Sequence, residues 1–130
     1  MKKLLNLILL IVILFSFTAC EKKQAKVARE FLEAMDRHDY DRARELSVKS
    51  GHEILDMLES FTEGLSDEAL EENANTDFKI IKTVVKGDSA TVTYEYWQKA
   101  EPDSIDIVEL PLVIEDGEWK VDLSKDNVAK

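Results

Sequence analysis

The side chain with the clearest potential chemistry is the thiol of Cys20, the only cysteine among 130 residues. It follows the basic start Met1-Lys2-Lys3 and an almost unbroken apolar run from Leu4 to Phe17. A basic start, an apolar core and small residues before a cleavage site define a secretory signal peptide. A lone thiol at the end of such a segment indicates covalent modification, because an exported protein with one cysteine offers it no intrachain partner.

The stretch Phe17-Thr18-Ala19-Cys20 resembles the lipobox of bacterial lipoproteins, in which the signal peptide is cut before a cysteine that then carries lipid. The resemblance implies a signal peptide over residues 1–19 and a lipidated tether over 20–25, with Cys20 as the lipidation site. We therefore expect the protein in the cell envelope, held to a membrane on its periplasmic or extracytoplasmic face. An uncleaved membrane anchor is the alternative. A spanning helix needs about 20 apolar residues, however, and Glu21-Lys22-Lys23 ends this run earlier.

The charge of the chain argues against nucleic acid as a partner. The full sequence has 17 basic and 27 acidic residues, for a net charge of −10. Loss of Lys2 and Lys3 with the signal peptide leaves 15 basic and 27 acidic residues, a net charge of −12. Such a surface disfavours polyanions and anionic lipid. We therefore expect membrane contact through the lipid on Cys20, with a small molecule or another protein as the further partner.

No residue pattern predicts a metal or a cofactor. His38 and His52 lie at turns in different segments, without spacing to a second ligand, so we expect surface or capping roles for them. Metal sites need several convergent ligands. The acidic cluster over residues 67–72 lacks the alternating Asp, Asn and Gly pattern of a calcium loop. A Gly-rich phosphate loop and a nucleophile elbow are also absent from the sequence.

Helical periodicity dominates the first part of the chain after Cys20. Helices are expected over 25–37, 40–47 and 52–63, and residues 66–75 fit a short helix or a loop. Asp39 is placed to cap the second helix. The spacing of Ser50 and Glu53 predicts a capping box for the third. The buried side of that third helix is expected to hold Ile54, Leu55, Leu58 and Phe61.

From Phe78 onward the apolar period changes from 3.6 to 2, which predicts strands over 78–85, 89–97, 105–114 and from 119. A polar loop is expected over 98–104, and Asp116-Gly117 is typical of a two-residue hairpin turn. Ile107 and Val108 belong to different phases, which predicts a β-bulge between them. Pro111 indicates an edge position or an unpaired site. Helices followed by an antiparallel meander predict an α+β fold with the helices on one face of the sheet.

Two stretches resemble nuclear transport factor 2-like (NTF2-like) domains, a cystatin-like group. Phe31-Leu32-Glu33-Ala34-Met35 with the turn His38-Asp39-Tyr40 is similar to the start of these domains. Gly117-Glu118-Trp119-Lys120-Val121 is similar to the end of a subset found in bacterial lipoproteins of unknown function, some of them lumazine-binding-like. The resemblance implies a single domain over 26–125, followed by a tail over 126–130. Its fold would be a cone, in which a curved sheet of about four strands wraps around the helices.

Such cones often hold a small ligand, and some relatives are enzymes that use an Asp or Glu base. The resemblance places Tyr94, Tyr96, Asp106 and Glu109 on strands that would line the cone. Burial there would raise the pKa of a carboxylate and let it transfer protons near neutrality. These residues match no enzyme constellation, which favours a non-enzymatic domain that binds a small ligand or a protein. A small isomerase or dehydratase-like enzyme and a purely structural envelope protein are the alternatives.

Overall fold

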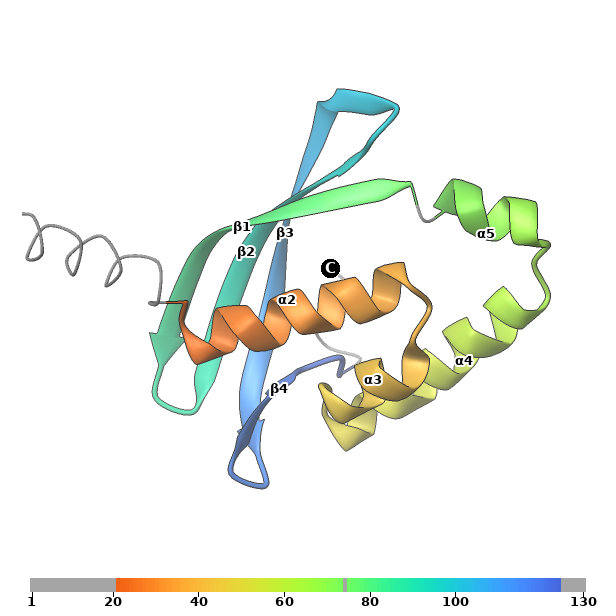
Figure 1. Cartoon of the computed structure of the whole chain (residues 1–130). Coiled ribbons are helices and arrows are strands. Elements are labelled where there is room, and N and C mark those ends of the chain that lie inside the picture. Colours follow the sequence, from red (N-terminus) through yellow and green to blue (C-terminus); the bar gives the residue numbers. More distant parts are fainter. Residues whose placement is uncertain (1–20, 74, 125–130) are drawn as a thin grey trace, which may run out of the picture.

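The computed structural model of the chain describes residues 21–73 and 75–124. The predicted signal peptide, the Cys20 lipidation site and the 126–130 tail lie outside these residues. Four α-helices and one short 3-10 helix, η1, precede four strands within the described part (Figure 1). The elements are α2 (Lys23–Asp36), α3 (Tyr40–Glu45), η1 (Lys49–Gly51), α4 (His52–Glu63), α5 (Asp67–Asn73), β1 (Thr76–Lys86), β2 (Ser89–Gln98), β3 (Glu101–Glu115) and β4 (Glu118–Val121).

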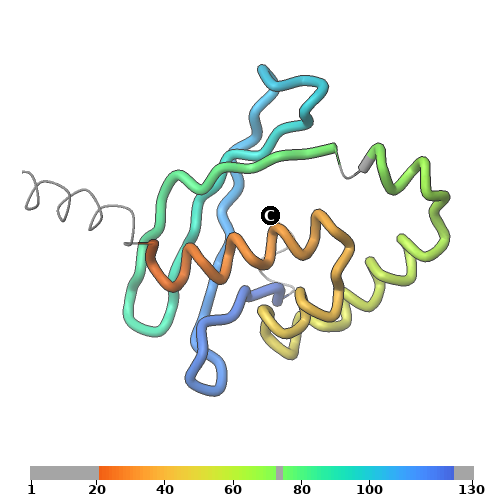
Figure 2. The backbone as a smooth tube through the Cα atoms, viewed as in Figure 1, coloured from red at the N-terminus to blue at the C-terminus, as the bar shows by residue number. Residues whose placement is uncertain are grey.

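The four strands form one antiparallel sheet in the order β1-β2-β3-β4, which confirms the predicted meander and the α+β fold. The sheet curves around α2, which crosses its inner face, while α4 and α5 extend away from the sheet (Figure 2). The Asp116-Gly117 hairpin turn is confirmed, with φ angles of 53° and 79°. None of the described helices has the length and apolar content required to cross a membrane.

The core lies between α2, α3 and the start of α4 on one side and the inner face of the sheet on the other. Ala28 and Phe31 of α2 are buried and face the sheet. Leu55 of α4 packs in the same cluster, and the sheet contributes Val92 and Leu112, which are fully buried. The burial of these side chains is the main stabilising contribution to the fold.

Two local predictions for the helices have opposite outcomes. The Asp39 cap is confirmed, because its Oδ1 accepts from the backbone N–H of Arg42 at 3.2 Å. The capping box of Ser50 and Glu53 is wrong. Ser50 lies inside η1, which runs directly into α4, and Gly51 precedes that helix without a side-chain cap. The N–H of Gly51 donates to the carbonyl of Val48 at 3.0 Å, so a tight turn replaces the box.

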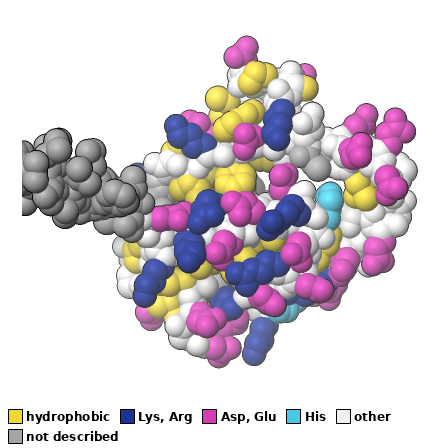
Figure 3. Space-filling model, viewed as in Figure 1, with side chains coloured by type: hydrophobic (Ala, Val, Ile, Leu, Met, Phe, Trp, Pro, Cys, Tyr) yellow, Lys and Arg dark blue, Asp and Glu magenta, His cyan; other side chains and the backbone are white. Residues whose placement is uncertain are grey.

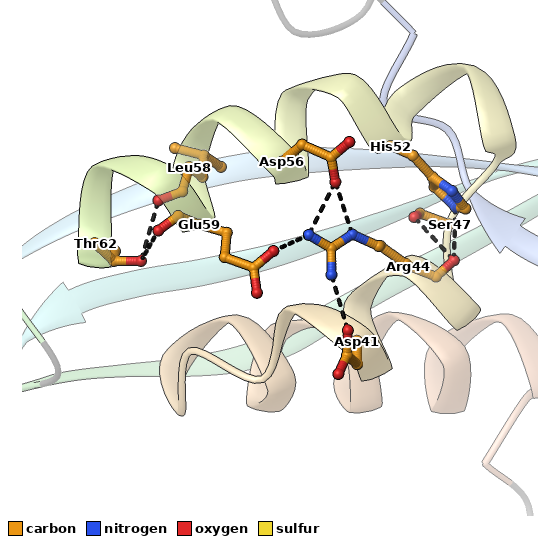
Figure 4. A network of polar contacts seen from close by, with 8 residues as sticks. All are labelled: Asp41, Arg44, Ser47, His52, Asp56, Leu58, Glu59 and Thr62. Carbon is orange, nitrogen blue, oxygen red and sulfur yellow. Dashed lines mark hydrogen bonds and ion pairs between the residues drawn. The ribbon is translucent and has the colours of Figure 1, made fainter. Parts of the chain in front are cut away.

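Helix α4 is joined to α3 by an ion-pair network centred on Arg44 (Figure 4). Its guanidinium contacts Asp41 at 2.9 Å on its own helix and reaches Asp56 at 2.9 Å and Glu59 on α4. The backbone carbonyl of Arg44 also lies 2.9 Å from Nε2 of His52. The expected capping or surface role of His52 is therefore met by a contact that connects the start of α4 to α3.

The predicted burial of Phe61 is wrong, since the residue is 67% exposed. The second half of α4 extends beyond the sheet, so nothing in the described chain covers that turn (Figure 1). Only Leu55 of the four expected residues is fully buried, while Ile54 and Leu58 are partly exposed. The periodicity predicted which side of α4 is apolar, but it could not predict where the sheet that covers this side ends.

The predicted β-bulge between Ile107 and Val108 is also wrong. The register of β2 and β3 is continuous from the pair Ser89↔Val113 to the pair Tyr96↔Asp106. Ile105 and Ile107 instead lie in the part of the β2–β3 hairpin that projects beyond the helices, where they are 49% and 68% exposed (Figure 1). Because the register is continuous, these two isoleucines alternate with the inner-face residues Asp106 and Val108 and lie on the outer face of the sheet.

The two prolines of β3 lie at positions where the pairing with the neighbouring strands requires no backbone N–H donor. The expected loop over 98–104 is shorter, because β3 already begins at Glu101 and includes Pro102. Pro102 lies in the irregular stretch between the pairs Gln98↔Glu101 and Tyr96↔Asp106. Pro111 does not lie on an edge strand as one alternative predicted. Its carbonyl accepts from the N–H of Asp122 at 2.8 Å, just past the last β3–β4 pair, so its nitrogen faces the side where β4 has ended.

Candidate ligand cavity

A cavity of about 170 Å³ lies between the C-terminal half of α2 and the strands β1 and β2. Its walls come from α2, the turn that follows it, the start of β1 and the inner face of β2. The lining residues are Leu32, Met35, Asp36, His38, Thr76, Phe78, Tyr94 and Tyr96. It therefore combines an apolar helix surface, an aromatic wall on the sheet, and a few polar groups.

A hydrogen bond at the cavity joins the C-terminal end of α2 to the sheet. The hydroxyl of Thr76 donates to Oδ1 of Asp36 at 2.8 Å, across 40 residues of sequence. Asp36 is the last residue of α2 and Thr76 the first residue of β1. This bond sets the distance between the helix and the strand, and with it the width of the cavity.

The aromatic wall is built from side chains that share the inner face of the sheet. Phe78 pairs with Tyr96 and Ile80 pairs with Tyr94 across β1 and β2. The rings of Phe78 and Tyr94 meet edge to face, with centroids 6.4 Å apart and planes at 81°, a favoured geometry for aromatic pairs. Burial raises the pKa of the Tyr94 hydroxyl, and the neighbouring Tyr96 adds to the shift. Neither tyrosine hydroxyl hydrogen-bonds to any described residue.

His38 contributes the buried polar atoms of the cavity that lack hydrogen-bond partners. Both of its ring nitrogens are buried, and neither has a hydrogen-bond partner among the described residues. The ring lies 6.3 Å from that of Tyr40, tilted by 32°. Its backbone adopts a φ of 56°, as the predicted tight turn between α2 and α3 requires. The expectation that His38 faces solvent is therefore wrong for its nitrogens, because the turn directs them inward.

The structure separates the four residues predicted to share a pocket. Tyr94 and Tyr96 line the cavity. Asp106 pairs with Tyr96 and so shares the inner face, but it is exposed and lines a neighbouring cleft of about 150 Å³ near the hairpin end. Glu109 pairs with Thr93 and lies on the outer face, in a hollow of about 250 Å³. Strand alternation explains the separation, since 106 and 109 differ by an odd number of residues.

Sequence reasoning missed the contributions of Asp36, His38, Thr76 and Phe78 to this cavity. Phe78 was recognised as the start of a strand, and the strand period alone would place it on a face with Ile80. His38 was recognised as the residue of a tight turn. The contact between Asp36 and Thr76 has no local signal, because it depends on how α2 lies across the sheet.

The chemistry available in the cavity is that of recognition through ring contacts and a few hydrogen bonds. A neutral imidazole offers one donor and one acceptor, and each tyrosine hydroxyl offers both. The Asp36 carboxyl stands close to these groups on the helix side. Among the described residues, no group of three or more His, Asp or Glu side chains is arranged to hold a metal ion.

Comparison with solved structures identifies the fold as NTF2-like. A candidate NTF2-like transpeptidase from Campylobacter jejuni superimposes with a TM-score of 0.52 at 17% identity, covering 79% of this chain and 100% of the other. An NTF2-like protein of unknown function from Cytophaga hutchinsonii gives a TM-score of 0.47 at 9% identity, covering 80% and 90%. No protein-family model and no curated protein matches the chain. At these identities the likeness concerns the fold alone.

Proposed function

We propose that this chain is a lipoprotein of the bacterial cell envelope, anchored through lipid on Cys20, whose NTF2-like domain binds a small molecule without transforming it. The binding site is the cavity between α2, β1 and β2. The anchoring half of the proposal is supported by the sequence around Cys20. The binding half is supported by the geometry of the cavity.

The observation that carries the binding half is the state of the His38 nitrogens. A buried polar group without a partner costs about 1–3 kcal/mol, and native proteins leave few such groups unless a function requires them. Both nitrogens of His38 are buried beside the cavity without a partner in the described chain. A ligand that supplies an acceptor or a donor would recover this cost, provided that the His38 ring turns toward the cavity, because both nitrogens are closed to solvent in the free chain.

The size and walls of the cavity define the class of ligand. Its volume of about 170 Å³ is similar to that of engineered cavities of about 150 Å³ that hold one benzene ring. Phe78, Tyr94 and Tyr96 supply flat apolar surface, and Leu32 and Met35 cover the opposite side. The ligand that fits is a single-ring molecule with one polar substituent directed at His38.

Imidazole NMR tests this proposal, because the chain has only two histidines. A panel of single-ring phenols, benzamides and pyridines is titrated into the protein while the ring resonances of both histidines are followed. Binding in the cavity shifts the His38 signals with saturation. His52, which contacts the Arg44 carbonyl outside the cavity, is the internal control. Equal shifts of both histidines, or none from His38 across the panel, would contradict the binding half.

A second candidate function is that of a small isomerase or dehydratase-like enzyme. It is favoured by one observation, namely that Asp36, His38 and Tyr94 line the same cavity. In that case Asp36, rather than Asp106 or Glu109, would be the carboxylate, held in place by the Thr76 hydroxyl. Asp36→Asn separates the two functions. It removes turnover in an enzyme, whereas a binding protein with His38 as its recognition group keeps most of its affinity.

A further inference from the structure

Five lysines gather at the end of the domain where the chain enters it. They are Lys22, Lys23, Lys26, Lys82 and Lys86. Lys22 precedes α2, and its ammonium donates to the carbonyl of Thr83 on β1 at 3.4 Å, which brings the helix start and the β1–β2 hairpin together. None of the five forms an ion pair with a described residue. Lys23 and Lys26 lie on the helix side, in a groove with the β3–β4 hairpin, and Lys82 and Lys86 lie on the outer face of the sheet. We call this end of the domain, where the two sides meet, the lysine face.

Most acidic side chains around the lysine face already form ion pairs with other basic side chains. Glu30, Glu45 and Glu118 line the groove that also contains Lys23 and Lys26. The occupying pairs are Glu21–Arg29 at 2.9 Å, Glu30–Arg42 at 3.0 Å, Glu45–Arg42 at 2.8 Å and Glu118–Lys120 at 3.2 Å. Glu109 lines the hollow that contains Lys82 and Lys86, and it forms no ion pair with a described residue. The five unpaired lysines therefore give this end an excess of positive charge.

The negative charge of the protein is concentrated elsewhere. Residues 50–78 contain nine Asp and Glu residues and no Lys or Arg. They form α4, α5 and the start of β1, and Figure 3 shows acidic side chains over α5 with no basic ones among them. Helix α2 runs from the lysine end of the domain toward the acidic end, and its 14 residues span about 21 Å. That distance exceeds two Debye lengths of about 8 Å at physiological ionic strength, so the acidic end is screened from a surface touching the lysines.

We propose that the lysine face rests on the anionic headgroups of the membrane that holds the chain. The inference depends on the proposed membrane anchor and extends it, because it assigns the orientation of the domain. The apolar segment 4–17 ends only a few residues before Lys22, so the lipid surface is the nearest large anion. Lys82 and Lys86 share a hollow on the outer face of the sheet with Thr91, Thr93 and Glu109. Ammonium and hydroxyl groups of this kind suit phosphate oxygens.

Clustered lysines bind anionic bilayers and release them at high salt. The net charge of −12 had argued against such binding, but that value averages over two ends of opposite character. The acidic α4–α5 end then points away from the bilayer. The cavity beside His38, at the far end of α2, stays open to the surrounding solution.

Lysine footprinting of the full protein tests the orientation. Protein purified from membranes is placed in vesicles of phosphatidylcholine alone or of phosphatidylcholine with phosphatidylglycerol, and flotation records whether it is membrane-bound. A water-soluble acylating reagent then labels lysines, and mass spectrometry reads each site. We expect Lys23, Lys26, Lys82 and Lys86 to label several-fold more slowly in the anionic vesicles. Lys99, in the turn of the β2–β3 hairpin, should label equally in both and is the internal reference.

The charge-reversed variant Lys82→Glu/Lys86→Glu should restore fast labelling of Lys23 and Lys26, whereas Lys99→Glu should not. All three positions are exposed, so the fold is expected to tolerate the changes. Equal labelling in both vesicle types, with the protein still floating, overturns the orientation and leaves the anchor intact. Failure to float overturns the anchor and this inference together, and leaves the binding cavity untouched.

Discussion

Gly51 lies against Leu123 so closely that a Cβ atom added to the glycine would stand 2.6 Å from the Cβ of the leucine. Carbon atoms pack without repulsion at about 3.5–4.0 Å. Gly51 ends the 3-10 turn before α4, and Leu123 follows β4 and packs against the core. The contact therefore fixes how the helix layer approaches the last strand, and it requires glycine for space rather than for backbone freedom.

Gly51→Ala should lower the free energy of unfolding by about 1–3 kcal/mol, because the new methyl forces the two segments apart. The matched control is Gly64→Ala. Gly64 ends α4 with a φ of −83°, and its nearest neighbour to a new Cβ is the Phe61 carbonyl oxygen at 3.5 Å. That variant should be neutral or stabilised by up to about 1 kcal/mol. Urea denaturation measures both, and equal stability of the two variants would show that the contact is not restrictive.

Two substitutions at His38 distinguish the free-energy cost of its backbone conformation from the role of its imidazole in ligand binding. With a φ of 56°, glycine is the better residue for the backbone. His38→Gly should therefore be more stable than His38→Ala by about 1 kcal/mol, since both lose the imidazole and only alanine keeps the strain. Both variants should lose the ligand recognised by the imidazole. Thermal denaturation ranks the pair, and an alanine variant at least as stable as the glycine variant contradicts this explanation.

Two residues of β3 test the position of the core. Leu112 is fully buried, and Leu112→Ala should cost about 2–5 kcal/mol of unfolding free energy through lost contacts and a cavity. Ile107 is 68% exposed on the same strand, so Ile107→Ala should change stability by about 0.5 kcal/mol or less. A large loss at Ile107 would mean that another layer covers the hairpin end. Chemical denaturation of the two variants side by side gives the comparison.

The sequence predicted those features that depend on a few neighbouring residues. The Asp39 cap and the Asp116-Gly117 turn are decided by side chains and φ angles within four residues, and both were correct. Phe61 was placed wrongly in the core, because the layer that would cover it ends before it reaches this residue. The bulge predicted beside Ile107 was also wrong, because the register is continuous there and Ile107 lies on the outer face of the sheet.

The candidate site was harder to predict than the fold because it forms where distant segments meet. Tyr94 and Tyr96 could be identified as neighbours on one strand face. Their meeting with His38 depends on the path of α2 across the sheet, which the hydrogen bond between Asp36 and Thr76 fixes over 40 residues. The family resemblance placed Asp106 and Glu109 on strands that would line the cone, and strand alternation puts them on opposite faces of the sheet.

Tyr94 should make the stability of the protein depend on alkaline pH. Burial raises its pKa in the folded state above the ordinary value, which is about 10 in an unfolded chain. The native state thus keeps the proton after the unfolded chain has lost it, so stability is complete below about pH 10 and falls as the pH rises further. Tyr94→Phe should remove this part of the pH dependence. Unfolding curves at several alkaline pH values decide the matter, and parallel losses in both proteins would exclude Tyr94 as the cause.

Cys20→Ser should abolish membrane attachment by lipid. Serine has no thiolate, which is the nucleophile that takes up the lipid at Cys20, and each buried methylene of a lipid chain contributes about 0.8 kcal/mol to membrane binding. The variant should therefore be found either free in the envelope or as a precursor that still carries residues 1–19. Membrane fractionation followed by intact-mass measurement distinguishes the two products. Thr18→Ser, which keeps a small residue before the cleavage site, should behave as the wild type. A Cys20→Ser protein that has the mature length and still remains with the membrane would show that something other than Cys20 holds it there.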